Sequence, residues 1–209
     1  MVRGHPQWRR AKALVDSGQI GTVRAMTGFF SYNNTDPANV RNVLEFGGGG
    51  LLDIGCYLVT TARFMFGGEP LRVAGAVERD PTSGVDRLTS LLMDFGGRHA
   101  IGTCSTQLLY YQRIQIIGTT GRIDIEIPFN APRDRPCRLF LDRTGDLAGS
   151  GIEEIPFEVC DQFSIQAEEF ARAIIENRPQ PVPLEDAVGN MACLDAIFRS
   201  SESGQWEHP

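Results

Sequence analysis

The sequence predicts an α+β fold in which helices pack on one face of a largely antiparallel, open sheet. Two observations carry this prediction. Short strand-like segments separated by polar or glycine-rich turns fill the middle of the chain, from residue 71 to residue 157. Helical periodicity occurs before and after them, without the regular strand–helix alternation that builds parallel sheets. The chain has 209 residues, of which 42% are hydrophobic, so it can bury a core of ordinary size.

The first element expected is a helix beginning at Pro6, because proline suits a first turn and apolar residues recur at helical spacing after it. Ser17 and Gly18 end this helix. Apolar and polar residues then alternate, which predicts a strand over Thr22–Tyr32. The polar segment Asn33–Glu45 is expected to be an irregular loop.

A second helix is expected over Leu51–Phe66, directly after the glycine run Gly47–Gly50. Short links between the strand-like segments that follow favour antiparallel neighbours. These segments are Arg72–Val77, Leu88–Phe95, Ala100–Gln107, Arg113–Ile117, Arg122–Ile127, Arg138–Leu141 and Ile152–Pro156.

Two helices are expected at the end of the chain. The first is capped by Asp161, and the second begins after Pro183. Each has an apolar stripe that should face the protein interior. The stripes are Phe163, Ala167, Phe170 and Ile174 in the first helix, and Leu184, Val188, Met191, Leu194 and Phe198 in the second.

Composition excludes several classes of protein. A formal net charge of −6 argues against a nucleic-acid or anionic-membrane binder, and no apolar run is long enough to span a membrane. Five scattered cysteines and three scattered histidines predict neither a disulfide framework nor a metal site, which fits a cytoplasmic protein. No G-x-G-x-x-G fingerprint occurs, and Gly118–Gly121 is expected to be a hairpin turn, so no residue is assigned to cofactor binding.

The segment Gly47–Phe64 contains the residues best suited to chemistry. Asp53 and Tyr57 are four residues apart, so in a helix they share one face. A carboxylate and a phenol that face one cleft can hold a substrate hydroxyl and exchange its proton. The spacing equally fits an aspartate placed by the helix dipole and a tyrosine used in packing. The glycines allow close approach of the backbone to a ligand or another domain.

The same segment resembles the G-G-G-x-L-x-D-x-G-x-[HY] signature of the Gfo/Idh/MocA family, named for glucose–fructose oxidoreductase, inositol dehydrogenase and rhizopine catabolism. Similar matches follow one another over nearly the whole chain. They are Arg3–Trp8, Gly18–Val23, Gln115–Gly121, Phe170–Ile175 and Leu184–Ser200. The last ionisable position of the signature is Tyr57 in this sequence, and in this respect the sequence resembles the subgroup of dimeric dihydrodiol dehydrogenase and pentose dehydrogenases.

The resemblance implies an oxidoreductase that uses NAD or NADP and acts on a sugar, polyol or related alcohol by hydride transfer. Tyr57 would be the acid/base residue, and Asp53 would orient the substrate or support Tyr57. Asn39 and Arg41 match an N-x-R pair that related enzymes place near substrate; a solvated loop is the alternative. Arg3 and His5 would lie at a domain junction, where His5 either contacts substrate or caps the first helix.

The family also has an N-terminal Rossmann domain and a lysine in an E-K-P motif, and this sequence contains neither. The resemblance therefore implies an isolated C-terminal domain, with residues 1–20 as an inter-domain helix remnant and residues 21–209 as the substrate-binding and oligomerisation domain. The expected partners are a small sugar or polyol, a second copy bound through the sheet face, and possibly a separate Rossmann-domain chain. The alternative is a non-catalytic assembly or binding module.

Overall fold

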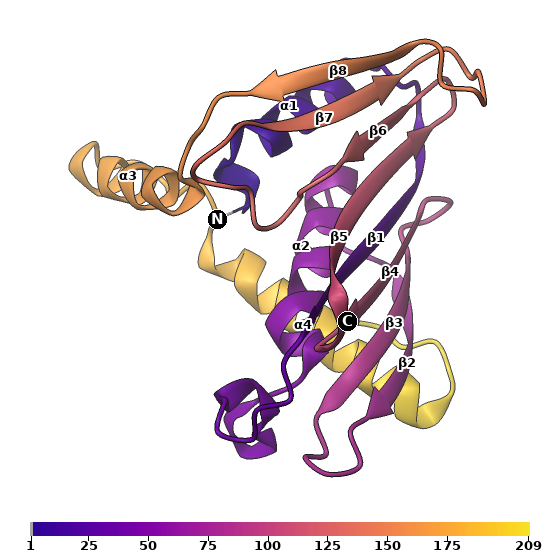
Figure 1. The fold of residues 1–209 in the computed structure, drawn as a ribbon, viewed down its shortest axis with the longest axis vertical. Coiled ribbons are helices and arrows are strands. Elements are labelled where there is room, and N and C mark those ends of the chain that lie inside the picture. Colours follow the sequence, from indigo (N-terminus) through magenta and orange to yellow (C-terminus); the bar gives the residue numbers. More distant parts are fainter. Residues whose placement is uncertain (1) are drawn as a thin grey trace. The chain divides into compact units, whose positions relative to one another are not determined.

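The computed structural model describes residues 2–209 and has the predicted α+β architecture (Figure 1). Its strands are Val23–Asn33 (β1), Arg72–Arg79 (β2), Asp86–Asp94 (β3), His99–Ser105 (β4), Gln107–Gly118 (β5), Arg122–Ile125 (β6), Cys137–Asp142 (β7) and Ile152–Phe157 (β8). Its α-helices are Pro6–Asp16 (α1), Cys56–Phe66 (α2), Gln162–Ile175 (α3) and Leu184–Ser203 (α4). Short 3₁₀ turns are Val2–Gly4 (η1), Val40–Asn42 (η2) and Leu44–Phe46 (η3), and Leu51–Gly55 (η4) is π-helical.

The strands form one sheet in the order β2-β3-β4-β1-β5-β6-β7-β8. Pairing is antiparallel for β2–β3, β3–β4, β5–β6, β6–β7 and β7–β8, which confirms the largely antiparallel prediction. The pair β1–β4 is parallel, in register from Ala25 with His99 to Ser31 with Ser105. The chain divides into two compact units, and each is described by itself.

The first unit, here the Asp53 unit, comprises Arg24–Arg113 and Gly189–Pro209. Its helices pack on one face of the strands, as predicted. Glycines on that face have no side chain, so the helices can approach the strands closely. A Cβ added to Gly102 on β4 would come within 2.9 Å of Leu58 on α2. One added to Gly75 on β2 would come within 2.7 Å of Ile197 on α4. The two glycines flank Leu91 of β3 in register, so both helices cover the same face.

The opposite face of the Asp53 unit follows from the strand alternation. Leu91 and Met93 are buried beneath the helices, whereas Ser90 points outward and bonds Thr103 of β4 across a 3.0 Å contact. Ile101 lies on this outer face and is 53% exposed.

The second unit, here the Trp8 unit, contains the described residues up to Val23 together with Ile114–Val188. Helix α1 packs on it through Trp8, which is fully buried, stacks on Phe129 and donates from Nε1 to the Pro128 carbonyl at 2.7 Å. The buried strand residues beneath are Ile114, Ile116, Ile123, Ile125, Leu139 and Leu141. This unit therefore has its own hydrophobic core.

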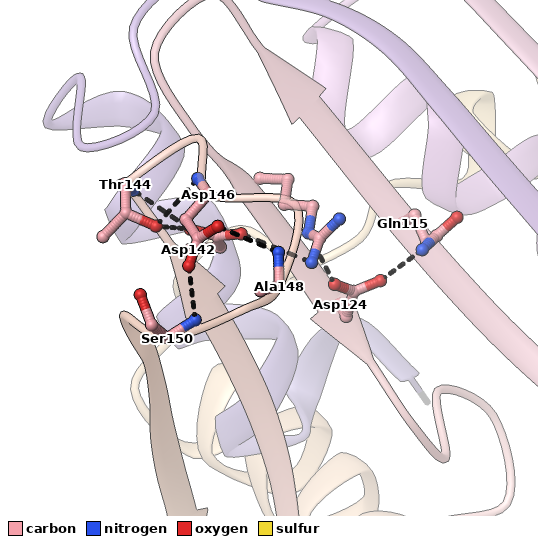
Figure 2. A network of polar contacts seen from close by, with 8 residues as sticks. Gln115, Asp124, Asp142, Thr144, Asp146, Ala148 and Ser150 are labelled. Atoms are coloured by element: carbon pink, nitrogen blue, oxygen red, sulfur yellow. Dashed lines mark hydrogen bonds and ion pairs between the residues drawn. The ribbon is translucent and has the colours of Figure 1, made fainter.

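A polar network joins β5, β6 and β7 in the Trp8 unit (Figure 2). Gln115 donates to Asp124 at 2.5 Å, and Arg122 contacts both Asp124 and Asp142 at 3.3 Å. The Asp142 carboxylate also accepts from the Thr144 amide at 3.0 Å, which closes the turn after β7. The hydrogen bonds to Thr144 and the ion pair with Arg122 compensate for the burial of the Asp142 carboxylate.

Three predictions about the extent or type of secondary-structure elements need correction. Residues 108–112, left between the predicted strand segments Ala100–Gln107 and Arg113–Ile117, lie inside β5, which runs unbroken from Gln107 to Gly118. The segment Asn33–Glu45 contains η2 and the start of η3. The helix predicted over Leu51–Phe66 has the right extent, but its first turn is π-helical.

The apolar stripe of α3 is the clearest departure from the prediction. Phe163, Phe170 and Ile174 are exposed, and Ile174 keeps 65% of its surface. The side that packs against the Trp8 unit instead buries Gln162 and Ala173. Leu184 and Val188, at the start of α4, are exposed as well. Within the Trp8 unit, the stripe expected to build the core therefore forms a surface.

None of the helices in residues 2–209 is both long and apolar enough to cross a membrane.

Candidate active site around Asp53 and Tyr57

The site is built on the π-helical turn η4. A π-helix closes i→i+5 hydrogen bonds, is rare, and occurs mostly as single turns, which are frequent at functional sites. Here it comprises Leu51–Gly55, carries Asp53, and runs directly into α2, whose second residue is Tyr57. The wider turn changes the angle between Asp53 and Tyr57 from the one that the i, i+4 spacing gives in an α-helix.

The preceding glycines are required by contacts within the chain. A Cβ on Gly48 would lie 2.6 Å from the Arg41 carbonyl oxygen. Gly49 has φ +123, and a Cβ there would lie 1.9 Å from an oxygen of Asp86. The close approach predicted from the glycine run is therefore made to the loop before it and to β3.

Asp53 holds two partners, one on each carboxylate oxygen. The Tyr32 hydroxyl donates to Oδ2 at 2.6 Å, and Arg41 Nε donates to Oδ1 at 2.9 Å. Tyr32 lies near the end of β1 and Arg41 lies in η2, so strand, loop and helix meet at this carboxylate. Burial, followed by the bond to Asp53, raises the pKa of Tyr32 well above its usual range. Tyr32 therefore keeps its proton and acts as a donor.

Tyr57 is half-buried beside this group. Its ring meets Phe30 of β1 edge-on, with centroids 5.8 Å apart. The pKa of Tyr57 is raised, first by burial and then by the neighbouring Cys56 and Asp53, while Arg41 lowers it. Burial also raises the pKa of the Cys56 thiol to about 11. Both groups are therefore protonated at neutral pH.

Asn39 and Arg41, the predicted N-x-R pair, have different local roles. The Asn39 side chain caps η2 by accepting from the Arg41 amide at 3.0 Å. It thus fixes the backbone of the residue that bonds Asp53. Arg41 is 49% exposed along its side chain, so its guanidinium is open to solvent while its Nε is engaged.

Arg3 and His5 belong to the Trp8 unit. Arg3 pairs with Asp186 at 3.0 Å. His5 is buried and its Nδ1 accepts from the Gln7 amide at 3.2 Å, which confirms the helix-capping alternative. Since Nδ1 accepts, the neutral ring carries its proton on Nε2, which lies 3.2 Å from Cys160 Sγ. A substrate role for either residue stays a prediction.

Two residues of the site were not predicted from the sequence. Tyr32 is the last residue but one of β1, a strand of ordinary alternation, and Asp86 follows a turn 33 positions after Asp53. Their contacts with η4 are tertiary, so no local spacing announces them. Among residues 2–209, no group of three histidine, cysteine or acidic side chains is arranged to hold a metal ion.

The comparisons with known proteins agree with this architecture. The family model described as the GFO/IDH/MocA C-terminal domain matches residues 8–124. An uncharacterized oxidoreductase of Rhizobium meliloti is 43% identical over 99% of this chain and 62% of its own length. D-xylose 1-dehydrogenase (NADP(+)) 2 of Haloferax volcanii is 31% identical over 98% of this chain and 61% of its own length.

Solved structures share the fold. A 3-ketoreductase from Actinomadura kijaniata, solved with NADP and TDP-benzene, gives a TM-score of 0.85 at 24% identity, over 95% of this chain and 60% of its own. The aldose-aldose oxidoreductase from Caulobacter crescentus, solved with glycerol, gives a TM-score of 0.87 at 22% identity, over 100% of this chain and 62% of its own. This chain thus spans about three fifths of the length of these proteins. The family match covers more than half of the chain, and the chain belongs to the Gfo/Idh/MocA family through its C-terminal domain.

Proposed function

We propose that this chain forms the substrate side of the active site of an NADP-dependent sugar oxidoreductase, with Tyr57 as the proton donor and acceptor. The observation that carries the proposal is the Tyr32–Asp53–Arg41 group on a π-helical turn beside a half-buried, protonated Tyr57. The names of two curated relatives specify D-xylose and NADP, which supports a sugar substrate and favours NADP over NAD.

The residues act on the substrate oxygen and its proton. Because burial raises its pKa, Tyr57 is protonated at neutral pH and has a proton to give to a substrate carbonyl oxygen in reduction, although the same shift makes it a weaker acid. In the opposite direction, Tyr57 must lose its proton, and the positive charge of Arg41 assists because it lowers the pKa of Tyr57. Asp53 keeps Arg41 in place and offers a carboxylate to substrate hydroxyls.

The cofactor does not fit the described residues. The glycine run precedes a helical segment, as a phosphate-binding loop does, but the Asp86 carboxylate accepts from the Leu51 amide at 2.6 Å at that N-terminus. A pyrophosphate would therefore meet a negative charge where it needs a donor. We propose that a dinucleotide-binding domain outside the two described units holds NADP, and we derive no step through it.

A chimera tests the function. This chain is joined to the dinucleotide-binding domain that family membership implies for the Rhizobium meliloti relative, and NADP-dependent turnover is followed with D-xylose and other aldoses. We expect turnover of at least one sugar and none with the dinucleotide-binding domain alone. A folded chimera that binds NADP and turns over no sugar would favour the non-catalytic assembly module.

A further inference from the structure

Asp86 is a buried acid that the proposed chemistry does not use. It begins β3, is 1% exposed, and lies within the Asp53 unit. Burial is the largest influence on its pKa and raises it. A carboxyl group in such a position costs stability unless hydrogen bonds compensate for the lost water.

The compensating bonds are directed at the π-helical turn. Asp86 Oδ2 accepts from the Leu51 amide at 2.6 Å and from the Thr89 hydroxyl at 3.0 Å. Leu51 is the first residue of η4, so its amide is one of the donors that a helix N-terminus leaves without an intrahelical partner. Thr89 is fully buried and secures the same oxygen from the β3 side.

The glycine run fits around this carboxylate. Gly49 is the point of closest approach, since a Cβ there would overlap Oδ1 at 1.9 Å. A Cβ on Gly50 would stand 3.4 Å from Oδ2. The backbone of Gly49 and Gly50 thus packs tightly against the Asp86 carboxylate, and this contact joins β3 to the start of η4.

We propose that Asp86 is a positioning residue that fixes the π-helical turn and, through it, the placement of Asp53 against Tyr32 and Arg41. Asp86 bonds the first residue of the turn, and Asp53 is the third, so a shift at Leu51 is transmitted over two peptide units. The inference rests on the proposed function only for its catalytic consequence. The anchoring itself is a property of this chain.

Hydrogen–deuterium exchange on the full chain tests the anchoring. In Asp86→Ala, the Leu51 amide loses its acceptor, and exchange across Leu51–Gly55 should rise about tenfold, because a buried donor left without a partner destabilises the closed turn. Asp86→Asn keeps an oxygen for the Leu51 amide and should restore most of the protection. The NMR resonance of the Tyr32 ring carbon that bears the hydroxyl should move in Asp86→Ala and return toward its original position in Asp86→Asn.

Asp142→Ala is the matched control. Asp142 is also a buried strand residue whose carboxylate accepts from a backbone amide and a threonine hydroxyl, but in the Trp8 unit. Its loss should leave both readouts at the Asp53 unit unchanged. Thr89→Val removes one hydrogen bond to Asp86 and keeps the side-chain shape, so it should give a smaller rise in exchange. This variant provides the test if the Asp86 variants fail to fold.

Unchanged exchange of Leu51–Gly55 in folded Asp86→Ala, or in Thr89→Val where the Asp86 variants do not fold, would overturn the inference. That result is independent of the chimera assay. An inactive chimera would refute the proposed function and leave the exchange measurements valid.

Discussion

Tyr57 and Tyr111 offer a comparison between two tyrosines of the same unit. Tyr57 faces the site, whereas Tyr111 is half exposed on β5 and stacks edge-on against Phe29. In the chimera, Tyr57→Phe should lower kcat by about 10²–10⁴-fold with a much smaller change in KM, because the ring and its packing remain and only the proton-transfer group is lost. Steady-state kinetics with D-xylose and NADP provide the measurement.

Tyr111→Phe removes the same hydroxyl from the outer face and should keep the parent kcat. Equal activity of Tyr57→Phe and the parent would show that another group carries the proton.

His5 should make the stability of the chain depend on pH. Burial lowers the pKa of His5, so the unfolded chain takes up a proton near pH 6.5 that the folded chain still excludes. Stability should therefore fall as the pH drops through about 6.5. His5→Asn retains a side-chain oxygen for the helix cap and does not titrate there, so the drop in unfolding free energy between about pH 7.5 and pH 5.5 should shrink.

Urea unfolding of the two proteins at both pH values measures the effect. An identical pH dependence would mean that His5 is already protonated in the folded chain, or that other groups dominate.

At the level of elements, α3 presents an apolar stripe without a cover in its own unit. We expect the dinucleotide-binding domain of the chimera to cover it. The N-terminal segment lies against this helix, since a Cβ on Gly4 would meet Ile165 at 3.5 Å and Arg9 pairs with Glu169. In the chimera, amide exchange in α3 should therefore be slower than in this chain alone, and Phe170→Glu should weaken that protection.

The exposed Leu147 provides the control, because Leu147→Glu changes an apolar side chain in a turn away from the stripe. Equal exchange of α3 in the chain and in the chimera would contradict the assignment of the stripe.

The same elements show how far the sequence is informative. Periodicity located every helix of the described chain longer than one turn. Asp53 and Tyr57 were singled out through the signature after the glycine run, and Arg41 through a separate N-x-R pair. Periodicity identifies an apolar face but not what covers it, which is why the α3 stripe was expected in the core. The π-helical turn was not predictable either, because it depends on Asp86 from β3, a contact that local spacing does not encode.

On the scale of the whole molecule, the outer sheet face of the Asp53 unit should bind a second copy of the chain. Apolar side chains are exposed there on β4 and β5, which lie on either side of β1: Ile101 of β4, and Leu109 of β5, which is 85% exposed. Monomeric proteins rarely expose a large apolar surface of this kind to solvent. Sedimentation at micromolar concentration should give a dimer or larger assembly, and Ile101→Glu should dissociate it.

Leu147→Glu should leave the assembly unchanged. A parent chain that sediments as a monomer at tens of micromolar would contradict this prediction.

The parallel pairing of β1 and β4 has a consequence for how the chain folds. η4, α2, β2 and β3 lie between the two strands in the sequence, so β1 is synthesised long before its partner. The β2-β3-β4 meander closes through local contacts, whereas β1 must wait for a long loop to form. We expect refolding to pass through a species in which one edge of β4 is unpaired. That edge is open to strands of other molecules, so the yield of native protein should fall as the refolding concentration rises.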